Sequence, residues 1–234
     1  MHLLEPKTIE QKEGLKLKYS RSKKLFGSDF EILQNAKVIL LGVGGVGSFA
    51  LDGLYRTGLT NITIVDFDVY EESNQNRQMG SETPGAIGSV KVDHLKTLYP
   101  NVTAINQKVD KEWLDTFDMS EYDFILDAID DIPMKVELIK KYHKKLISTT
   151  GSAKRFDPTK IEYINIFKTY NDPFARKIRD MLKKDRFRKS YKVIFSSENP
   201  NCKELGSFVG VTGAFGLTMC SITIKKILSV KQIK

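Results

Sequence analysis

The stretch Lys37-Val-Ile-Leu-Leu-Gly-Val-Gly-Gly-Val-Gly47 decides the fold of this chain. Its first five residues form an apolar run, which is typical of a parallel strand that is buried on both faces. The glycines that follow allow a tight turn and a close backbone approach to a phosphate. The predicted helix over 48–57 that comes next favours an anion at its N-terminus. The four glycines of this turn are Gly42, Gly44, Gly45 and Gly47.

The next part of the chain adds an acid to the glycine turn. Residues 61–65 predict a second strand, and Asp66 follows it, nineteen residues beyond Gly47. A carboxylate at the end of this strand holds ribose hydroxyls in nucleotide-binding proteins. A glycine turn alone would also suit a purely structural role. The order of strand, glycine turn, helix, strand and acid favours a nucleotide site.

Strands alternate with helices up to about residue 150. Further strands are predicted over 103–109, 124–129 and 146–150, and helices over 89–98 and 135–145. Short connections between such elements indicate an α/β fold with a Rossmann-like, doubly wound and mainly parallel sheet.

The pattern changes after Gly151. Residues 161–169 alternate apolar and polar side chains, as in a half-exposed antiparallel strand, and 191–196 predict another short strand. Asp172-Pro173 predicts the start of a helix, and 208–228 predict the closing helix. We therefore expect an antiparallel C-terminal extension of the same sheet.

The composition is that of a soluble globular protein. The chain has 234 residues, of which 41% are hydrophobic and 28% charged, and a formal net charge of +8. That length suits one domain over 1–234, with a nucleotide-binding core at 19–150 and a substrate-facing elaboration at 151–234. Two cysteines cannot build a disulfide framework or a four-cysteine zinc site. Residues 1–24 lack the apolar stretch of a signal peptide, which predicts a cytoplasmic protein.

One apolar stretch has the length of a membrane span. Residues 207–224 hold no charged residue across eighteen positions. Eight of the eighteen are Gly, Ser or Thr, and Gly210, Gly213 and Gly216 recur at a spacing that lets another backbone pack closely. A helix buried in the core or at a subunit interface is therefore favoured over a membrane span.

Basic residues close to the ribose acid argue against a nicotinamide or flavin enzyme. Arg77 lies in Ser73-Asn-Gln-Asn-Arg-Gln78, and Lys91 follows in Gly88-Ser-Val-Lys91. An arginine and a lysine here suit a triphosphate, because they neutralise its charge and stabilise a leaving pyrophosphate. Taken singly, each is also explained as a solvated loop charge.

Together these motifs, with Asp127-Ala-Ile-Asp130-Asp131, resemble the ubiquitin-activating-enzyme-like adenylyltransferases, the ThiF/MoeB/HesA superfamily. The resemblance implies that the glycine turn binds the phosphates of ATP and that Arg77, Lys91 and Asp130 are catalytic. It also implies that Asp130 holds Mg²⁺ and that Arg21 reaches the nucleotide of a partner subunit in a homodimer. Two alternatives are that Arg21 is a surface charge and that Lys24 serves in its place. The implied nucleotide-binding residues beyond the glycines are Arg21, Asp66, Asp68, Asn74, Arg77 and Lys91.

Within that superfamily the chain is similar to the tRNA threonylcarbamoyladenosine dehydratases, the TcdA/CsdL family. Matching motifs include Leu25-Phe-Gly27, Thr149-Thr-Gly-Ser152, Phe195-Ser-Ser-Glu198 and Thr212-Gly-Ala-Phe-Gly216, and the Cys-x-x-Cys pairs of zinc-bearing branches are missing. The resemblance implies ATP-dependent cyclisation of threonylcarbamoyladenosine in tRNA, by adenylation of its carboxylate. It further implies a bound K⁺ or Na⁺ and sulfur-transfer partner proteins. The alternatives are an adenylyltransferase for a small sulfur-carrier protein and a Rossmann-type binding or redox protein.

The positive charge is concentrated in one segment. Residues 176–192 hold nine basic and two acidic residues, a net charge of +7, with Phe187 and Tyr191 among them. Such a cluster favours phosphate contacts to RNA, and its aromatic side chains are expected to stack on bases. A solvated helix face or an acidic protein partner is the alternative. The predicted tRNA-binding residues are Lys183, Lys184, Arg186, Arg188 and Lys189.

The two cysteines differ in their surroundings. Cys202 lies in a predicted loop beside basic residues, and some relatives use a cysteine thioester. We interpret Cys202 as non-catalytic, with a nucleophile as the alternative. Cys220 lies in the apolar closing helix and is predicted to be a core residue.

Overall fold

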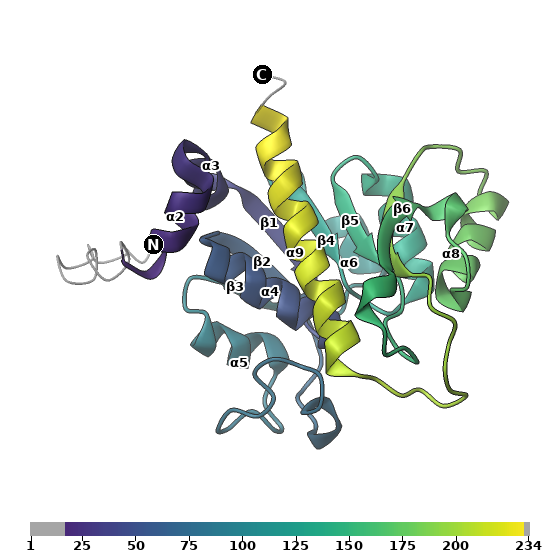
Figure 1. Cartoon of the computed structure of the whole chain (residues 1–234), viewed down its shortest axis with the longest axis horizontal. Helices are drawn as coiled ribbons and strands as arrows, with labels where there is room; N and C mark the ends of the chain where they lie inside the picture. Colours follow the sequence, from purple (N-terminus) through teal and green to yellow (C-terminus); the bar gives the residue numbers. More distant parts are fainter. Residues whose placement is uncertain (1–16, 232–234) are drawn as a thin grey trace.

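The apolar run after Ala36 forms an inner strand of one sheet in the computed structural model, which describes residues 17–231 (Figure 1). The strand order is β3-β2-β1-β4-β5-β7-β6. Every neighbouring pair is parallel except β6 and β7, which are antiparallel. The predicted fold class is therefore confirmed. The strands are β1 (Lys37–Leu41), β2 (Asn61–Asp66), β3 (Thr103–Asn106), β4 (Phe124–Asp127), β5 (Leu146–Thr149), β6 (Ile161–Asn165) and β7 (Lys192–Ser196).

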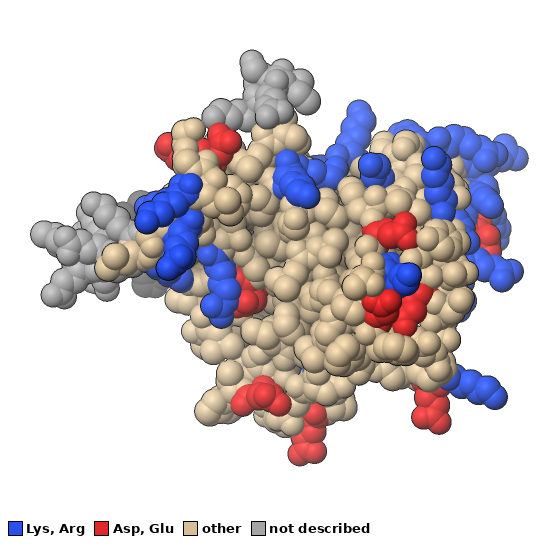
Figure 2. Space-filling view, viewed as in Figure 1, with Lys and Arg blue, Asp and Glu red and all other residues tan. Residues whose placement is uncertain are grey.

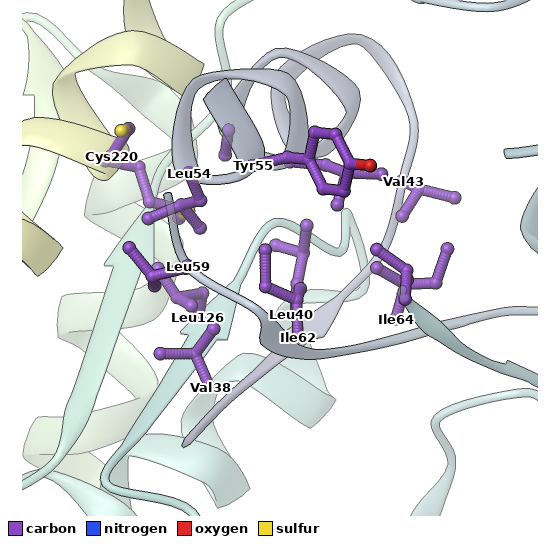
Figure 3. Close-up of a cluster of buried hydrophobic side chains, with 14 of the residues drawn as sticks. Val38, Leu40, Val43, Leu54, Tyr55, Leu59, Ile62, Ile64, Leu126 and Cys220 are labelled. Carbon is purple, nitrogen blue, oxygen red and sulfur yellow. The ribbon is translucent and has the colours of Figure 1, made fainter. Parts of the chain in front are cut away.

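Helices cover both faces of the sheet. Val38 and Leu40 point to one face, where they join a core cluster with residues of α4, α5 and α9, and all four apolar residues of β1 are fully buried. Figure 3 shows this cluster, in which Leu54 and Tyr55 of α4 lie over β1 and β2 and Cys220 of α9 lies beside them. Ile39 and Leu41 point to the other face, toward α6, α7 and α8. The helices of the described part are α2 (Ser20–Phe26), α3 (Phe30–Asn35), α4 (Gly45–Thr57), α5 (Lys91–Leu98), α6 (Lys111–Thr116), α7 (Ile132–Tyr142), α8 (Pro173–Lys184) and α9 (Val209–Lys231).

The sheet has a topological switch point beside β1. The chain leaves β1 for β2 on one side, and later places β4 on the other side of β1. Because the crossover connections diverge there, a crevice forms at the carboxyl ends of these strands, which is where open α/β sheets bind ligands.

Several element boundaries differ from the sequence predictions. The helix predicted from residue 48 begins at Gly45, and the helix predicted from residue 135 begins at Ile132, because the Asp131 side chain accepts a hydrogen bond from Met134 N. The strand predicted over 161–169 ends at Asn165, whose side chain accepts from Phe167 N and starts a 3₁₀ turn. The short helices α2, α3 and α6 were not predicted.

The start of α8 was predicted correctly from Asp172-Pro173. The Asp172 carboxylate accepts hydrogen bonds from Phe174 N and Ala175 N, and Pro173 stands where a helix has no need of an N–H donor. The last turn carries Lys183 and Lys184, where positive charge is favourable to the helix dipole.

The closing helix α9 is a core helix. Val211, Phe215 and Met219 are fully buried. A Cβ atom at Gly216 would lie 2.4 Å from Val46 O, so this glycine is what lets α9 pack against the backbone of α4. One helix of the described residues, Val209–Ser229, is long and apolar enough to cross a membrane, and 56% of that window is buried.

The two thiols should react differently with a water-soluble thiol reagent. Cys220 is buried, and burial raises the pKa of its thiol to about 11, whereas Cys202 is exposed. At pH 8 we expect fast labelling of Cys202 alone, and labelling of Cys220 only after denaturation, because the thiolate is the reactive form. Intact-mass spectrometry measures this, with Cys202→Ser as the control that should abolish the fast reaction.

Candidate nucleotide-binding and active site

A cleft of about 730 Å³ opens at the carboxyl ends of the parallel strands. Its walls include Gly42 after β1, Asp66 at the end of β2, Ala128 after β4 and Thr149 at the end of β5. The cleft therefore occupies the switch point beside β1, as the alternation of strands and helices predicts.

Two glycines of the turn are required by the backbone of the chain itself. Gly42 has φ +84°, and a Cβ atom there would lie 2.9 Å from Ala128 O. A Cβ atom at Gly47 would lie 1.9 Å from Gly42 O, and Gly47 does not line the cleft. Gly42 and Gly47 thus shape the turn by close packing.

The other two glycines face the cleft. Gly44 is the N-cap of α4 without a capping side chain, and Gly45 is the first residue of the helix. The nearest atom to a Cβ at Gly44 would be Gln78 Nε2, at 3.9 Å. The space beside Gly44 is therefore open, and no side chain caps the N-terminus of α4. Such a helix N-terminus offers its backbone N–H groups to an anion.

Asp66 holds two loops at the edge of the cleft. Its Oδ2 accepts from Val43 N at 2.8 Å, and its Oδ1 accepts from Asp68 N at 2.9 Å. The residue is 9% exposed. The carboxylate is therefore fixed beside the glycine turn, in the orientation that these backbone donors impose, and it still lines the cleft.

Lys91 and Asp68 form an ion pair that the sequence did not predict. Lys91 Nζ lies 3.0 Å from Asp68 Oδ2, with the lysine side chain 6% exposed and the aspartate side chain 49% exposed. Lys91 N also donates to Asp68 O at 2.9 Å. Both residues line the cleft, so the ammonium group is held at its wall before any phosphate arrives.

Asn74 and Arg77 also line the cleft, and Arg77 lies beside Gly45 of the glycine turn. The Asn74 side chain accepts from Glu71 N at 3.2 Å and is buried, which stabilises the 3₁₀ turn Glu72–Asn74. Arg77 Nη1 donates to Ser73 O at 2.7 Å and to Asn76 Oδ1 at 2.9 Å. Within residues 17–229 no carboxylate forms an ion pair with Arg77, so its charge is left for a ligand.

Asp130 is an exposed carboxylate three residues beyond the end of β4, on the wall of the cleft. Its neighbour Asp131 is engaged as the N-cap of α7. No group of three or more His, Cys, Asp or Glu side chains gathers among the described residues. A metal ion at Asp130 would need phosphate oxygens as further ligands, and this is the way Mg²⁺ is usually bound with nucleotides.

Arg21 and the basic segment lie outside the cleft. Arg21 is exposed on α2 and does not line the cleft of its own chain. The five predicted tRNA-binding residues are exposed at the end of α8 and just after it, and no carboxylate of the described chain pairs with them. Figure 2 shows Lys and Arg side chains gathered over this side of the molecule. We call these five residues (183, 184, 186, 188 and 189) the basic surface. It lies at the C-terminal end of α8, whose first turn lies at the cleft.

The expected base stacking by aromatic residues is wrong. Phe187 is 8% exposed and Tyr191 is 3% exposed, and both belong to the core cluster beneath α8. Phe187 packs edge-on against His143. The aromatic residues interleaved in the basic segment anchor it to the core, and only its charged side chains are free to meet a ligand.

Sequence reasoning missed part of the cleft wall. Gln78 is 8% exposed, its Oε1 has no hydrogen-bond partner within the described chain, and it lines the cleft next to Arg77. Residues 149–153, Phe174, Leu205, Ser207 and Thr212 also line it. Their positions in the sequence were the available signal for these residues. Residues 149–153 follow the carboxyl end of a buried strand, and Phe174 lies in the first turn of the helix whose start Asp172-Pro173 marks.

Comparisons with known proteins agree with this geometry. A model of the ThiF family matches residues 19–234. The tRNA threonylcarbamoyladenosine dehydratase of Bacillus subtilis is 36% identical over 192 residues, which cover 78% of this chain and 75% of that protein. The crystal structure of Escherichia coli tRNA N6-threonylcarbamoyladenosine dehydratase, TcdA, in complex with AMP is 28% identical, with a TM-score of 0.86 over 93% of this chain and 96% of that one. Its complex with ATP is 26% identical, with a TM-score of 0.86 over 94% and 97%.

Proposed function

Because this chain belongs to the ThiF family, we propose that it is an ATP-dependent enzyme that cyclises threonylcarbamoyladenosine in tRNA. The observation that carries the proposal is the match, over nearly the whole chain, to a dehydratase solved with AMP and with ATP. The cleft supports it, since its glycine turn, fixed carboxylate and unpaired Arg77 suit a nucleoside triphosphate.

The first step is attack of the substrate carboxylate on the α-phosphorus of ATP. One carboxylate oxygen bonds to phosphorus as the bond to pyrophosphate breaks, which yields an acyl-adenylate. The chain contributes positioning and charge neutralisation. The N-terminus of α4 receives phosphate oxygens, Asp66 holds the ribose, and Arg77 with Lys91 stabilises the charge that moves to pyrophosphate.

The second step closes a ring within the substrate. The ureido nitrogen attacks the activated carbonyl carbon, AMP leaves with the former carboxylate oxygen, and the nitrogen loses a proton. The net change in the nucleoside is the loss of one water. Because the nucleophile belongs to the substrate, no catalytic cysteine is required, which agrees with Cys202 lying on an exposed loop outside the cleft lining.

Mg²⁺ fits the acidic wall of the cleft. Asp130 would hold it through a carboxylate oxygen together with phosphate oxygens of ATP, and the ion would supply charge neutralisation at the phosphates. Asp130 is exposed, lines the cleft and stands beside a carboxylate that is engaged as a helix cap, so it is the residue with free ligand capacity.

The homodimer remains a prediction, and the exposure of Arg21 outside its own cleft supports its role at the nucleotide of a partner subunit. A bound K⁺ or Na⁺, sulfur-transfer partner proteins and a cytoplasmic location also remain predictions.

The test is conversion of the modified nucleoside. The protein is incubated with ATP, Mg²⁺ and tRNA that bears threonylcarbamoyladenosine, and the digested nucleosides are analysed by mass spectrometry. We expect the cyclic product, lighter by one water, together with AMP and pyrophosphate. If instead ATP–pyrophosphate exchange responded to a small protein ending in Gly-Gly and not to tRNA, the chain would be a carrier-protein adenylyltransferase. Tight nicotinamide binding without protection by ATP would make it a redox protein.

The basic surface is expected to bind the tRNA backbone. Replacing Lys183, Lys184, Arg186 and Arg188 with alanine should weaken tRNA binding and reduce the slope of log affinity against log salt by about three. Fluorescence anisotropy at several salt concentrations measures this. In the control variant, Lys37 and Lys111 are replaced, since both are exposed lysines paired with carboxylates elsewhere on the surface. An unchanged slope in the fourfold variant would make the basic surface a solvated face only.

A further inference from the structure

The charged residues that line the cleft all come from the first part of the lining in sequence, which begins with the glycine turn. Every one of them lies between Asp66 and Asp131 in the sequence, and we call their wall the charged side. The nine lining residues from 149 onward are all uncharged. We call their wall the neutral lobe; it consists of residues 149–153, Phe174, Leu205, Ser207 and Thr212. A triphosphate with its metal ion needs the charged side, so the neutral lobe is available to another ligand.

A buried arginine holds the loop after β5, which forms part of the neutral lobe. Arg155 is 5% exposed, and its Nη1 donates to Gly151 O at 2.6 Å and to Ala153 O at 3.3 Å. Its Nε donates to Glu198 O at 3.1 Å. These bonds fix the loop after β5 without any ligand, so the lobe is preformed, as binding sites usually are.

The same arginine connects the lobe to the helix that carries the basic surface. Arg155 Nη2 lies 3.4 Å from Asp172 Oδ1, and Asp172 caps α8. Asp172 Oδ2 also accepts from Thr150 Oγ1 at 2.6 Å. One buried carboxylate therefore joins the loop after β5 to α8, whose first turn places Phe174 in the lobe and whose last turn begins the basic surface.

The neutral lobe also meets the phosphate end of the charged side. The Cβ of Thr212 lies 3.5 Å from the position of a Cβ at Gly45, at the start of α4. Asn76 Nδ2 donates to Ser207 O at 3.2 Å, which ties the segment before α9 to the neighbour of Arg77. A ligand in the lobe would thus have its reactive end beside the glycine turn.

We propose that the neutral lobe is the acceptor subsite, which takes one unpaired nucleoside of an RNA loop with its hydroxylated, carboxylate-bearing side chain. The inference rests on the proposed function. An aromatic ring, an apolar side chain, threonine and serine hydroxyls and loop backbone are the groups that hold an uncharged base drawn out of a loop. RNA phosphates on the basic surface stay outside, and the carboxylate reaches the α-phosphorus at the mouth of the lobe.

Filling the neutral lobe with a large side chain should impair binding of the RNA acceptor and leave ATP binding unchanged. Ser152→Trp places a large ring in the lobe, and we expect kcat/KM for modified tRNA to fall about 100-fold or more, because the acceptor is displaced. ATP affinity, measured by calorimetry on the same preparation, should stay within about twofold and also shows that the chain is folded. Thr159→Trp is the matched control, since Thr159 is exposed, small and polar and does not line the cleft.

A charge at the rim tests the lobe without risk to folding. Leu205 is 82% exposed. Leu205→Glu should raise KM for modified tRNA about tenfold through repulsion of the substrate carboxylate, whereas Leu205→Gln, which has the same shape, should not. Unmodified tRNA should bind equally well to both variants. Equal weakening for modified and unmodified tRNA would mean repulsion of the RNA backbone only, which would contradict the acceptor subsite.

The wild-type assay separates failure of this inference from failure of the proposed function. If the wild type forms no cyclic product, the proposed function is wrong, and the acceptor assignment that rests on it is wrong too. If the wild type cyclises tRNA and Ser152→Trp does so at a similar rate, the lobe does not hold the acceptor. If Ser152→Trp loses ATP affinity while Thr159→Trp keeps it, the lobe belongs to the nucleotide site and the inference is overturned.

Discussion

Arg77→Ala is expected to lower the rate of AMP formation in the presence of modified tRNA by about 10³-fold, the size of effect that follows removal of a key charge from a transferring phosphoryl group. The stem of the Arg77 side chain lies beside the glycine turn, since a Cβ at Gly45 would be 3.4 Å from Arg77 Cγ, and Arg77 lines the cleft. Its two hydrogen bonds, to Ser73 O and to Asn76, orient it without neutralising it. Single-turnover assays with labelled ATP measure the loss.

The fold should tolerate this substitution, because Arg77 is half-buried at the cleft and outside both core clusters. Arg56→Ala is the matched control: that arginine is exposed on α4 and paired with Asp52 on the same helix. Both variants should keep the wild-type thermal unfolding midpoint within a few degrees. AMP formation by Arg77→Ala within threefold of the wild type would remove Arg77 from the reaction.

Much of the sheet could be predicted because its decisive features are local. The apolar run of β1 and the glycines after it are contiguous, and Asp172-Pro173 carries the capping chemistry of α8 in two adjacent residues. Boundaries were less accurate where a side chain from just outside the element sets them. The Asp131 cap starts α7 three residues before the predicted start at residue 135, and Asn165 ends β6 by capping a turn.

Much of the charged side of the cleft could be predicted for the same reason, since its predicted residues lie in contiguous motifs that follow β2 and β4. Lys108, which follows β3, was not predicted. The motifs did not predict which of their side chains pair with one another. The ion pair between Lys91 and Asp68 needs the loop after β2 to turn back on the start of α5. Phe187 was wrongly predicted to stack on bases, because the charged residues around it indicate an exposed segment. Its aromatic side chain instead packs into the core cluster beneath α8.

The neutral lobe could not be predicted as a unit. Thr149–Ser152 and Thr212 lie in motifs that match the dehydratase family, but only tertiary structure brings them together. Thr212 lies beside Gly45, although most of the chain separates them in sequence. Arg155 pairs with Asp172 only because the antiparallel extension brings the two residues together. None of these residues has a charge pattern or spacing that points to the others. Buried polar contacts of this kind become visible only once the chain is folded.

A second such contact supports the end of the cleft that carries Asp130 and gives the largest expected effect on stability. Lys135 Nζ lies 2.8 Å from Asp127 Oδ1, and the two side chains are 1% and 0% exposed. Ser148 Oγ donates to the other carboxylate oxygen. Burial lowers the pKa of Lys135, and the Asp127 carboxylate opposes that shift. We expect Lys135→Ala to reduce the free energy of unfolding by about 3–5 kcal/mol, because it leaves the carboxylate buried without its counter-charge.

Chemical denaturation measures the loss, and Lys111→Ala is the matched control. Lys111 also pairs with an aspartate, at 3.1 Å, but its side chain is 78% exposed, so its removal should change the free energy of unfolding by less than about 1 kcal/mol. The double variant Asp127→Leu, Lys135→Leu removes both charges and should be less destabilised than the sum of the single changes. Additive losses would show that the pair contributes by packing rather than by charge compensation.

The position of the pair links this stability to the reaction. Asp127 is the last residue of β4, and Ile129 N donates to its Oδ1 at 3.3 Å, so the carboxylate also holds the turn that leads to Asp130. Lys135→Ala should therefore lower turnover more than ATP affinity, at a temperature where the variant is still folded. If the variant were destabilised but fully active, the ion pair would not act on the reaction through Asp130. It would then be a purely structural contact beneath the cleft.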